Sequence, residues 1–336
     1  MAQSSDELIK REIIDKVGGS QILKLRIFHQ SSTDDQVLFS GGGLTFGQNG
    51  VSYGSCDAAW YTDAEWIDPY NLKTYARKPV IALEGTDALN RNSSGNAQYQ
   101  RFHHALGAVK NGITGIYYLR KGSCKIQEDL FGMAYFASKI ESGNYIITDD
   151  LEFIKKLIES YNTAKYDELI NDELEAMYAK FNTKFSSKYK SSWEVFANAR
   201  STIIQGNVVI KYAGRMRRNF TDSSQRAGHI SVGEMYLTKY YFYNKQMIYL
   251  FPKMTSKDLA ILDKSKSVDK EWHLLRHEPN VTIKTLDDIN GLDQSIYKNL
   301  ISIADMPLKG EALRIYSENL KVIVEGIKSG KYTVKL

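Results

Sequence analysis

The chain has 336 residues, of which 43% are hydrophobic and 12% aromatic, and this composition excludes a disordered or fibrous protein. Its two cysteines, Cys56 and Cys124, are too few for a disulfide framework. No apolar run approaches the ~18 residues that a membrane-spanning helix needs, and the N-terminus lacks the apolar core of a signal peptide. We therefore expect a cytoplasmic protein that has no membrane partner.

The net charge of +5 is unevenly distributed along the sequence. Residues 1–150 hold 15 basic and 17 acidic side chains, whereas residues 151–336 hold 29 basic and 22 acidic ones. The window 184–226 alone holds nine basic and two acidic side chains, so it accounts for the whole excess of the second half. A local basic window is typical of a surface that faces a polyanion such as nucleic acid. The alternative is a solvated basic face.

The hydrophobic pattern predicts that helices and strands alternate through the first half of the chain. The predicted order is helix 5–17, strand 22–28, hairpins within 37–53, strands 57–61 and 79–84, helix 97–108, strand 113–119, helix 131–140, strand 145–148, and helices 151–158 and 169–181. This order predicts an α/β (α+β) fold in which helices flank a mixed central β-sheet.

The character of the sequence changes after residue 183, where we place a domain boundary. Residues 184–336 are predicted to form an additional α+β region, with a helix at Trp193–Ile204 and a strand at Val208–Tyr212. The segments His229–Val232 and Met235–Phe251 are rich in tyrosine and β-branched residues, which favour strands.

Two carboxylates stand at the ends of apolar runs in the first half. Asp57 directly precedes the run Ala58–Tyr61, and Glu84 directly follows the run Val80–Leu83. Burying a charge is costly unless it is paired or binds a metal, and Mg²⁺ prefers carboxylate oxygens. The pattern therefore indicates either a divalent-cation site or a structural salt bridge to a nearby arginine. Asp63 and Asp68 are rival candidates for the first acid.

The segment Ser55–Thr148 resembles the PD-(D/E)XK nuclease superfamily, and within it the type II restriction endonucleases. The resemblance is carried by a strand beginning at a carboxylate, a strand ending in an acid, a helix and a further strand. Asp57 stands at the aspartate of the family motif, and Glu84-Gly85-Thr86 stands where the family has acid-x-Lys. The chain departs from the pattern by Cys56 in place of proline and by Thr86 in place of lysine.

The resemblance implies a restriction-endonuclease-like core over residues 1–183 and a target-recognition region over residues 184–336. It implies a type II endonuclease that hydrolyses phosphodiester bonds in double-stranded DNA as a homodimer. Mg²⁺ would be held by Asp57 and Glu84 and would polarise the phosphate. The expected catalytic residues are Asp57, Glu84, Thr86, Gln98 and His103, with His104 as the alternative histidine. The expected DNA contacts are Arg91, Arg101, Arg215, Arg217, Arg218 and Arg226.

Two other functions stay open at this level. One is a nuclease of the same superfamily that acts in repair or phage defence without sequence specificity. The other is a DNA-binding protein on the same fold that has lost catalysis, which the missing lysine at Thr86 favours.

Overall fold

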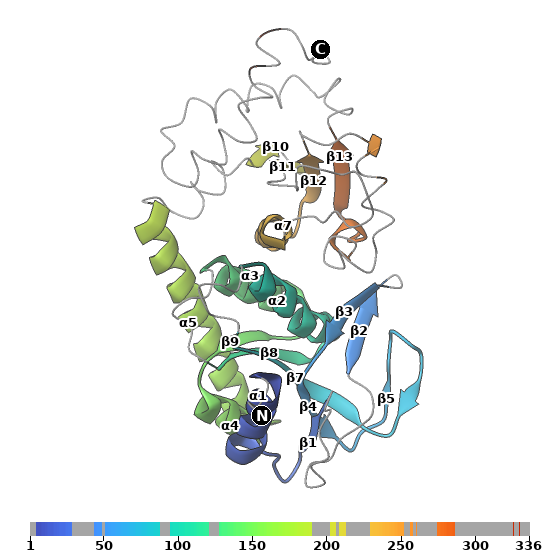
Figure 1. Cartoon of the computed structure of the whole chain (residues 1–336), viewed down its shortest axis with the longest axis vertical. Helices are drawn as coiled ribbons and strands as arrows, with labels where there is room; N and C mark the ends of the chain where they lie inside the picture. Colours follow the sequence, from blue (N-terminus) through green and yellow to red (C-terminus); the bar gives the residue numbers. More distant parts are fainter. Residues whose placement is uncertain are drawn as a thin grey trace. The chain divides into compact units, whose positions relative to one another are not determined.

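The computed structural model describes residues 5–28, 44–48, 51–87, 95–120, 128–189, 202–205, 208–212, 229–251, 256–257, 260, 274–285, 325 and 329. The chain divides into two units, Met1–Lys180 and Phe181–Leu336. This division lies within helix α5 (Ala164–Tyr189), and the boundary expected after residue 183 lies within the same helix. Figure 1 shows the elements of both units.

A five-stranded sheet forms the centre of the first unit, with the strand order β1-β4-β7-β8-β9. The strands are β1 (Lys24–Ile27), β4 (Ala58–Thr62), β7 (Lys78–Thr86), β8 (Thr114–Leu119) and β9 (Tyr145–Thr148). The pairs β1–β4 and β4–β7 are antiparallel, whereas β7–β8 and β8–β9 are parallel. The mixed central sheet predicted from the sequence is therefore confirmed.

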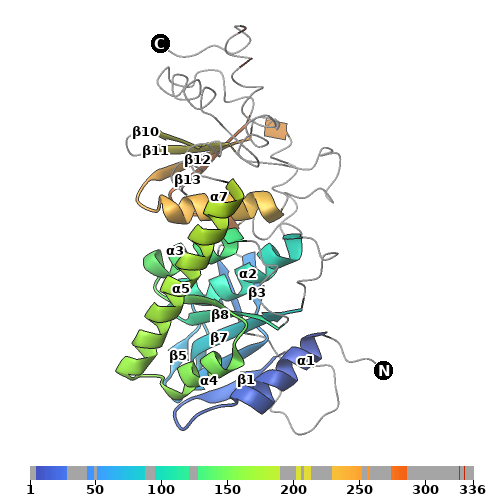
Figure 2. The same ribbon diagram turned by 90° about the vertical axis from the view of Figure 1, so that its left-hand side faces the viewer.

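Helices lie on both faces of this sheet (Figures 1 and 2). The helices α2 (Gly95–Lys110) and α3 (Glu128–Ile140) connect the three parallel strands and lie together on one face. The helix α1 (Ser5–Glu12), its π-helical continuation η1 (Ile13–Val17) and α4 (Leu151–Glu159) lie on the other. Every residue of β8 and β9 is buried, as expected for strands that are covered on both faces.

Contacts of single side chains fix the helices against the sheet. The Tyr145 ring stacks on Phe102 of α2 at 4.2 Å between ring centroids, and its hydroxyl donates to the Phe102 carbonyl oxygen at 2.6 Å. Asp150 caps α4 by accepting hydrogen bonds from two backbone amides of the first turn. The backbone amide of Ile147 in β9 donates to the Met177 sulfur, so α5 packs beside this edge strand.

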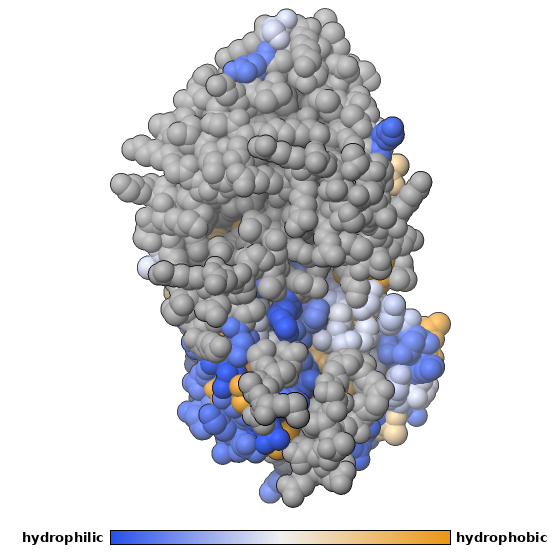
Figure 3. Space-filling view, viewed as in Figure 1, coloured by the Kyte–Doolittle hydropathy of each residue, from blue (hydrophilic) through white to orange (hydrophobic). Residues whose placement is uncertain are grey.

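Two short hairpins extend from the first unit. One pairs β2 (Thr45–Gln48) with β3 (Val51–Ser55), as the glycine-rich pattern predicts, and it packs against α2. The other pairs β5 (Trp66–Ile67) with β6 (Thr74–Tyr75). Exposed apolar side chains gather on this second hairpin, including Ile67 and Leu72. Figure 3 shows that small hydrophobic patches, in orange, are scattered among the hydrophilic surface of the described residues.

The second unit contains a four-stranded sheet with the order β10-β11-β12-β13. Its strands are β10 (Thr202–Gln205), β11 (Val208–Tyr212), β12 (Gln246–Phe251) and β13 (Val281–Thr285), and α7 (His229–Tyr241) lies between β11 and β12 in the chain. Because β11 and β12 are parallel, they need a crossover connection such as α7. An additional α+β region is therefore confirmed.

Two sequence predictions in this unit are wrong. The segment His229–Val232 and the start of Met235–Phe251 form helix α7 instead of strands. Tyrosines and β-branched residues favour strands locally, but Tyr236 and Tyr240 are four residues apart and are buried on one helix face. The end of the helix predicted at Trp193–Ile204 lies in strand β10. Among the described residues, no helix combines the length and the apolar character needed to cross a membrane.

Candidate active site

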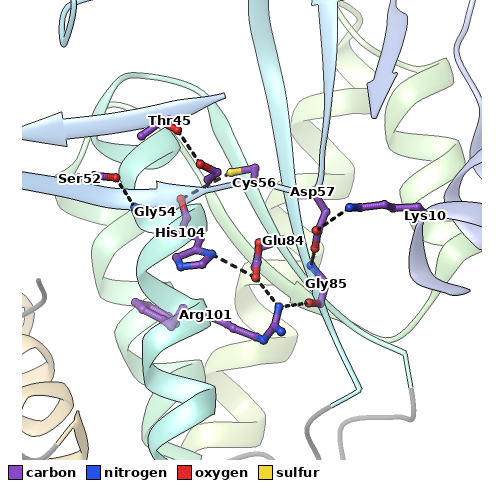
Figure 4. Close-up of polar contacts among 12 residues, drawn as sticks. Lys10, Thr45, Ser52, Gly54, Cys56, Asp57, Glu84, Gly85, Arg101 and His104 are labelled. Carbon is purple, nitrogen blue, oxygen red and sulfur yellow. Dashed lines mark hydrogen bonds and ion pairs between the residues drawn. The ribbon is translucent and has the colours of Figure 1, made fainter. Parts of the chain in front are cut away.

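The two acids singled out in the sequence lie side by side on neighbouring strands of the first unit (Figure 4). Asp57 directly precedes β4, and its backbone amide donates to the Leu83 carbonyl oxygen of β7 at 2.8 Å. Leu83 is the ladder partner of Ala58, the next residue, so Asp57 lies beside the segment of β7 that carries Glu84. The side chains of Asp57 and Glu84 are 11% and 2% exposed. Two nearly dry carboxylates therefore lie on adjoining segments of the sheet, where each requires a positive or hydrogen-bonding partner.

The Asp57 carboxylate is held by the backbone of β7 and by a lysine from α1. Its Oδ2 accepts a hydrogen bond from the Gly85 amide at 2.9 Å, and its Oδ1 lies 3.8 Å from Nζ of Lys10, a side chain only 4% exposed. Gly85 allows α1 to pack this close to β7, because a Cβ at residue 85 would lie 2.5 Å from the Ile9 side chain of α1. Sequence reasoning missed Lys10, since a lysine among helical apolar residues is normally exposed.

The Glu84 carboxylate is held by two side chains of α2. Arg101 Nη1 donates to Glu84 Oε1 at 2.8 Å and to the Gly85 carbonyl oxygen at 3.1 Å. His104 Nδ1 lies 3.2 Å from the same Oε1. Arg101 and His104 are three residues apart and therefore share one helix face. The helix that follows Glu84 in the chain thus returns across the sheet and presents both groups to this acid.

Burial and the acid pair set the protonation states of the neighbouring groups. Burial lowers the pKa of His104, but the hydrogen bond to Glu84 and its negative charge outweigh this effect and the pKa is raised. The raised pKa favours an imidazolium beside the carboxylate. Burial, followed by the charges of Glu84 and Asp57, raises the pKa of the Cys56 thiol well above its ordinary value. Cys56 is therefore a protonated thiol, which is a poor nucleophile.

Gly54 of β3 makes room for the His104 ring. Its φ is +110°, and a Cβ at residue 54 would overlap the imidazole. We expect Gly54→Ala to lower the free energy of unfolding by about 3 kcal/mol, through both overpacking and backbone strain. Gly112→Ala is the matched control, because its φ is +73° but the nearest atom, in Ser142, is 3.7 Å away. The control should lose about 1 kcal/mol in chemical denaturation. Equal losses for the two variants would refute this role of Gly54.

The other predicted catalytic residues take different positions. Thr86 is fully buried, two residues beyond Glu84 on β7, so period-two alternation places both on one face of the sheet. Gln98 is buried near the start of α2. His103 is also buried and packs edge-on against the Phe102 ring, with 6.0 Å between centroids. Of the two histidines, His104 is the one that lies beside Glu84.

The rival acids have other partners. Asp63 is 67% exposed and forms surface ion pairs with Lys24 and Arg77, at 3.0 and 3.2 Å. Asp68 is buried, and its Oδ1 accepts a hydrogen bond from the Tyr70 amide at 2.8 Å in the turn after β5. Asp57 is thus the candidate that is hydrogen-bonded to β7 on both sides of Glu84, at Leu83 and Gly85.

Among the six arginines expected to contact DNA, Arg101 belongs to the described part of the chain, and its guanidinium faces Glu84. The remaining five lie outside the described residues: Arg91, Arg215, Arg217, Arg218 and Arg226.

Three groups around the two acids offer oxygen atoms, which are the ligands that a hard divalent cation prefers. They are the carboxylates of Asp57 and Glu84 and the carbonyl oxygen of Gly85. Within the described ranges, no group of three or more histidine, cysteine, aspartate or glutamate side chains is arranged to hold a metal. Mg²⁺ does not need such a cage, because it keeps several waters and binds through one or two carboxylates and a substrate phosphate. The carboxylate and carbonyl oxygens are therefore donors of the kind that Mg²⁺ takes.

Comparisons of the chain with protein-family models, with curated proteins and with solved structures find no match. A function is therefore inferred from the two acids, their partners and the order of the elements that carry them.

Proposed function

We propose that this protein is a Mg²⁺-dependent endonuclease that hydrolyses phosphodiester bonds in double-stranded DNA, of the sequence-specific type II restriction kind. The observation that carries the proposal is the placement of Asp57 and Glu84 on adjacent strands, followed by α2 and β8. This is the order of carboxylate strand, acid-ending strand, helix and strand on which the resemblance to the PD-(D/E)XK superfamily rests. The mixed sheet supports a restriction-endonuclease-like core for the first unit.

In this proposal the two acids and Lys10 have distinct tasks. Asp57 and Glu84 would hold Mg²⁺, which would supply Lewis-acid polarisation of the phosphate and lower the pKa of a water molecule. The buried surroundings strengthen the electrostatic contacts of the two carboxylates. Lys10 fixes the orientation of Asp57 and balances its charge. Thr86 replaces the lysine of the family motif, and in this proposal Lys10 of α1 provides a positive charge near the acids instead.

The second unit is the proposed DNA-reading part. Its basic window, residues 184–226, carries nine basic and two acidic side chains and suits a phosphate-facing surface. Arginines serve both phosphates and guanine edges, which supports the assignment of Arg215, Arg217, Arg218 and Arg226 to target recognition. A homodimer is part of the proposal, because two-fold proteins match two-fold DNA sites.

Lys10→Met tests the orientation of Asp57. Methionine fills a similar volume without the charge, so we expect the turnover rate for DNA cleavage to fall about 10²-fold through misplacement of the carboxylate. Stability should fall by about 2 kcal/mol, because a mostly buried carboxylate loses a cationic neighbour. The Michaelis constant for DNA should stay near the wild-type value, which a general loss of structure would not produce. Lys10→Arg should recover most of the rate, and failure to recover it despite normal folding would contradict an electrostatic role.

Thr86→Val tests whether the hydroxyl at the motif's lysine position takes part in the reaction. Valine keeps the shape but removes the hydroxyl, so we expect the cleavage rate to fall about tenfold, a larger effect than the stability loss. The control is Thr114→Val, because Thr114 lies in the same sheet and its hydroxyl is 2.8 Å from the Tyr166 hydroxyl, away from the acids. The control should lose stability and keep its rate. An unchanged rate in Thr86→Val would remove this residue from the reaction.

Incubating long duplex DNA of varied sequence with the purified protein and Mg²⁺ tests the proposal. Discrete fragments are expected for a type II enzyme. A smear of products would mean cleavage without sequence specificity, and it would favour a repair or defence nuclease. Intact DNA that is nevertheless bound by the protein would favour a DNA-binding protein without catalysis, and the endonuclease proposal would fail.

A further inference from the structure

One atom of Arg101 bridges two of the three oxygen donors in the candidate active site. Its Nη1 lies 2.8 Å from Glu84 Oε1 and 3.1 Å from the Gly85 carbonyl oxygen, as Figure 4 shows. We propose that Arg101 occupies the cation position of the site in the DNA-free protein, and that its guanidinium and a divalent cation exclude each other there. This inference rests on the proposed function and adds to it a control of cation entry.

Geometry is the first support for this exclusion. Mg²⁺ binds oxygen ligands at about 2.0–2.1 Å, so an ion bound to both Glu84 Oε1 and the Gly85 oxygen would take the space of the Arg101 Nη1. The exclusion does not require the backbone to move. The Arg101 side chain is 29% exposed and can withdraw toward solvent, whereas the Glu84 side chain is 2% exposed and stays in place.

Charge is the second support. The two carboxylates, Asp57 and Glu84, already face two cationic side chains, Lys10 and Arg101, and His104 also lies beside Glu84. Adding a divalent cation to these groups would leave a large excess of positive charge among nearly dry side chains, which is costly. If Arg101 leaves as the cation enters, the excess is smaller, and Glu84 keeps a positive partner throughout.

The released guanidinium then needs a partner of its own. Arginine presents five N–H donors in a planar fork that matches the oxygens of a phosphate. A DNA phosphate near the solvent-exposed part of Arg101 would therefore draw it away from Glu84 and free the cation position. Because binding linkage is reciprocal, DNA should raise the affinity for the cation, and the cation should raise the affinity for DNA. Cation loading would thus be coupled to the presence of the substrate.

The test is a calorimetric titration of Mn²⁺, as the probe cation, into the DNA-free full-length protein. Arg101→Met should bind Mn²⁺ about tenfold or more tightly than wild type, because no guanidinium competes for Glu84. Arg77→Met is the matched control, since it also removes one positive charge from an arginine–carboxylate pair, that with Asp63. The control should bind Mn²⁺ as wild type does, and Glu84→Gln should abolish the binding.

The outcomes separate this inference from the proposed function. If Arg101→Met binds Mn²⁺ no more tightly than wild type while Glu84→Gln loses binding, the inference fails and the cation site stands. If Glu84→Gln binds as wild type does, both the inference and the proposed cation site fail. If the Arg101→Met variant folds poorly, a second measurement on the wild-type protein tests the inference. In the wild-type protein, Mg²⁺ should shift the guanidinium nuclear magnetic resonance signal of Arg101, assigned with Arg101→Lys, toward that of a solvated arginine. An unshifted signal at saturating Mg²⁺ overturns the inference.

Discussion

Glu84→Gln should lower the rate of DNA cleavage by about 10³-fold. The reason is that electrostatic stabilisation of the transition state in a dry site is usually the largest single contribution to catalysis. Glutamine keeps the length of the side chain, and its amide oxygen can still accept the hydrogen bond from Arg101 that Glu84 Oε1 accepts at 2.8 Å. The fold should therefore persist, and the affinity for DNA measured without a cation should stay near the wild-type value. A single-turnover cleavage assay with matched binding measurements checks this expectation.

Glu141→Gln is the control for the loss of an ion-paired carboxylate. Glu141 belongs to the same unit, and its Oε1 lies 3.0 Å from Lys110 Nζ in a partly buried pair. This control should lose a similar small amount of stability and keep its cleavage rate. Full cleavage by Glu84→Gln, or an equal loss in Glu141→Gln, would mean that Glu84 has a structural role only.

Asp57→Asn should have an effect of the same size. Asparagine can keep the hydrogen bond that Asp57 Oδ2 accepts from the Gly85 amide, but it removes the charge beside Lys10. The substitution removes one negative charge from beside the buried Lys10, so we expect a stability loss of about 2 kcal/mol together with a cleavage rate about 10³-fold lower. Rate and stability are measured on the same preparation.

The matched variant is Asp63→Asn, which removes a carboxylate from an exposed pair on the same unit. Exposed ion pairs contribute little, so stability and cleavage should both stay near wild type. If Asp63→Asn is inactive and Asp57→Asn is active, the first acid has been assigned to the wrong end of β4.

The strands of the candidate site are predictable from the sequence because each acid adjoins an apolar run. The apolar runs next to Asp57 and Glu84 form β4 and β7. The fully buried strands β8 and β9 are likewise predicted by short apolar runs. Strand β7 continues beyond Glu84 because Gly85 and Thr86 pair with Tyr118 and Leu119 of β8. That pairing depends on a strand 28 positions or more away, which no local pattern contains.

The partners of the acids are not predictable in the same way. Lys10 is buried because Gly85 lets α1 approach β7, and this approach depends on an Ile9 contact distant in sequence. Whether His103 or His104 faces Glu84 depends on the rotation of α2 about its axis, since neighbours on a helix differ by about 100°. The error over α7 has a related cause, because a buried crossover helix and a buried strand share an apolar, aromatic composition.

The most direct test of the acid pair is the Mg²⁺-dependent cleavage of duplex DNA by wild type and by the Asp57→Asn/Glu84→Gln double variant, purified in parallel. Residues that act as one unit are not additive, so the double variant should cleave no more slowly than either single variant, about 10³-fold below wild type. Their common residual rate would identify Asp57 and Glu84 as one hydrolytic centre. Cleavage by the double variant at the wild-type rate, or no cleavage of any duplex by the folded wild-type protein with Mg²⁺, would contradict the account.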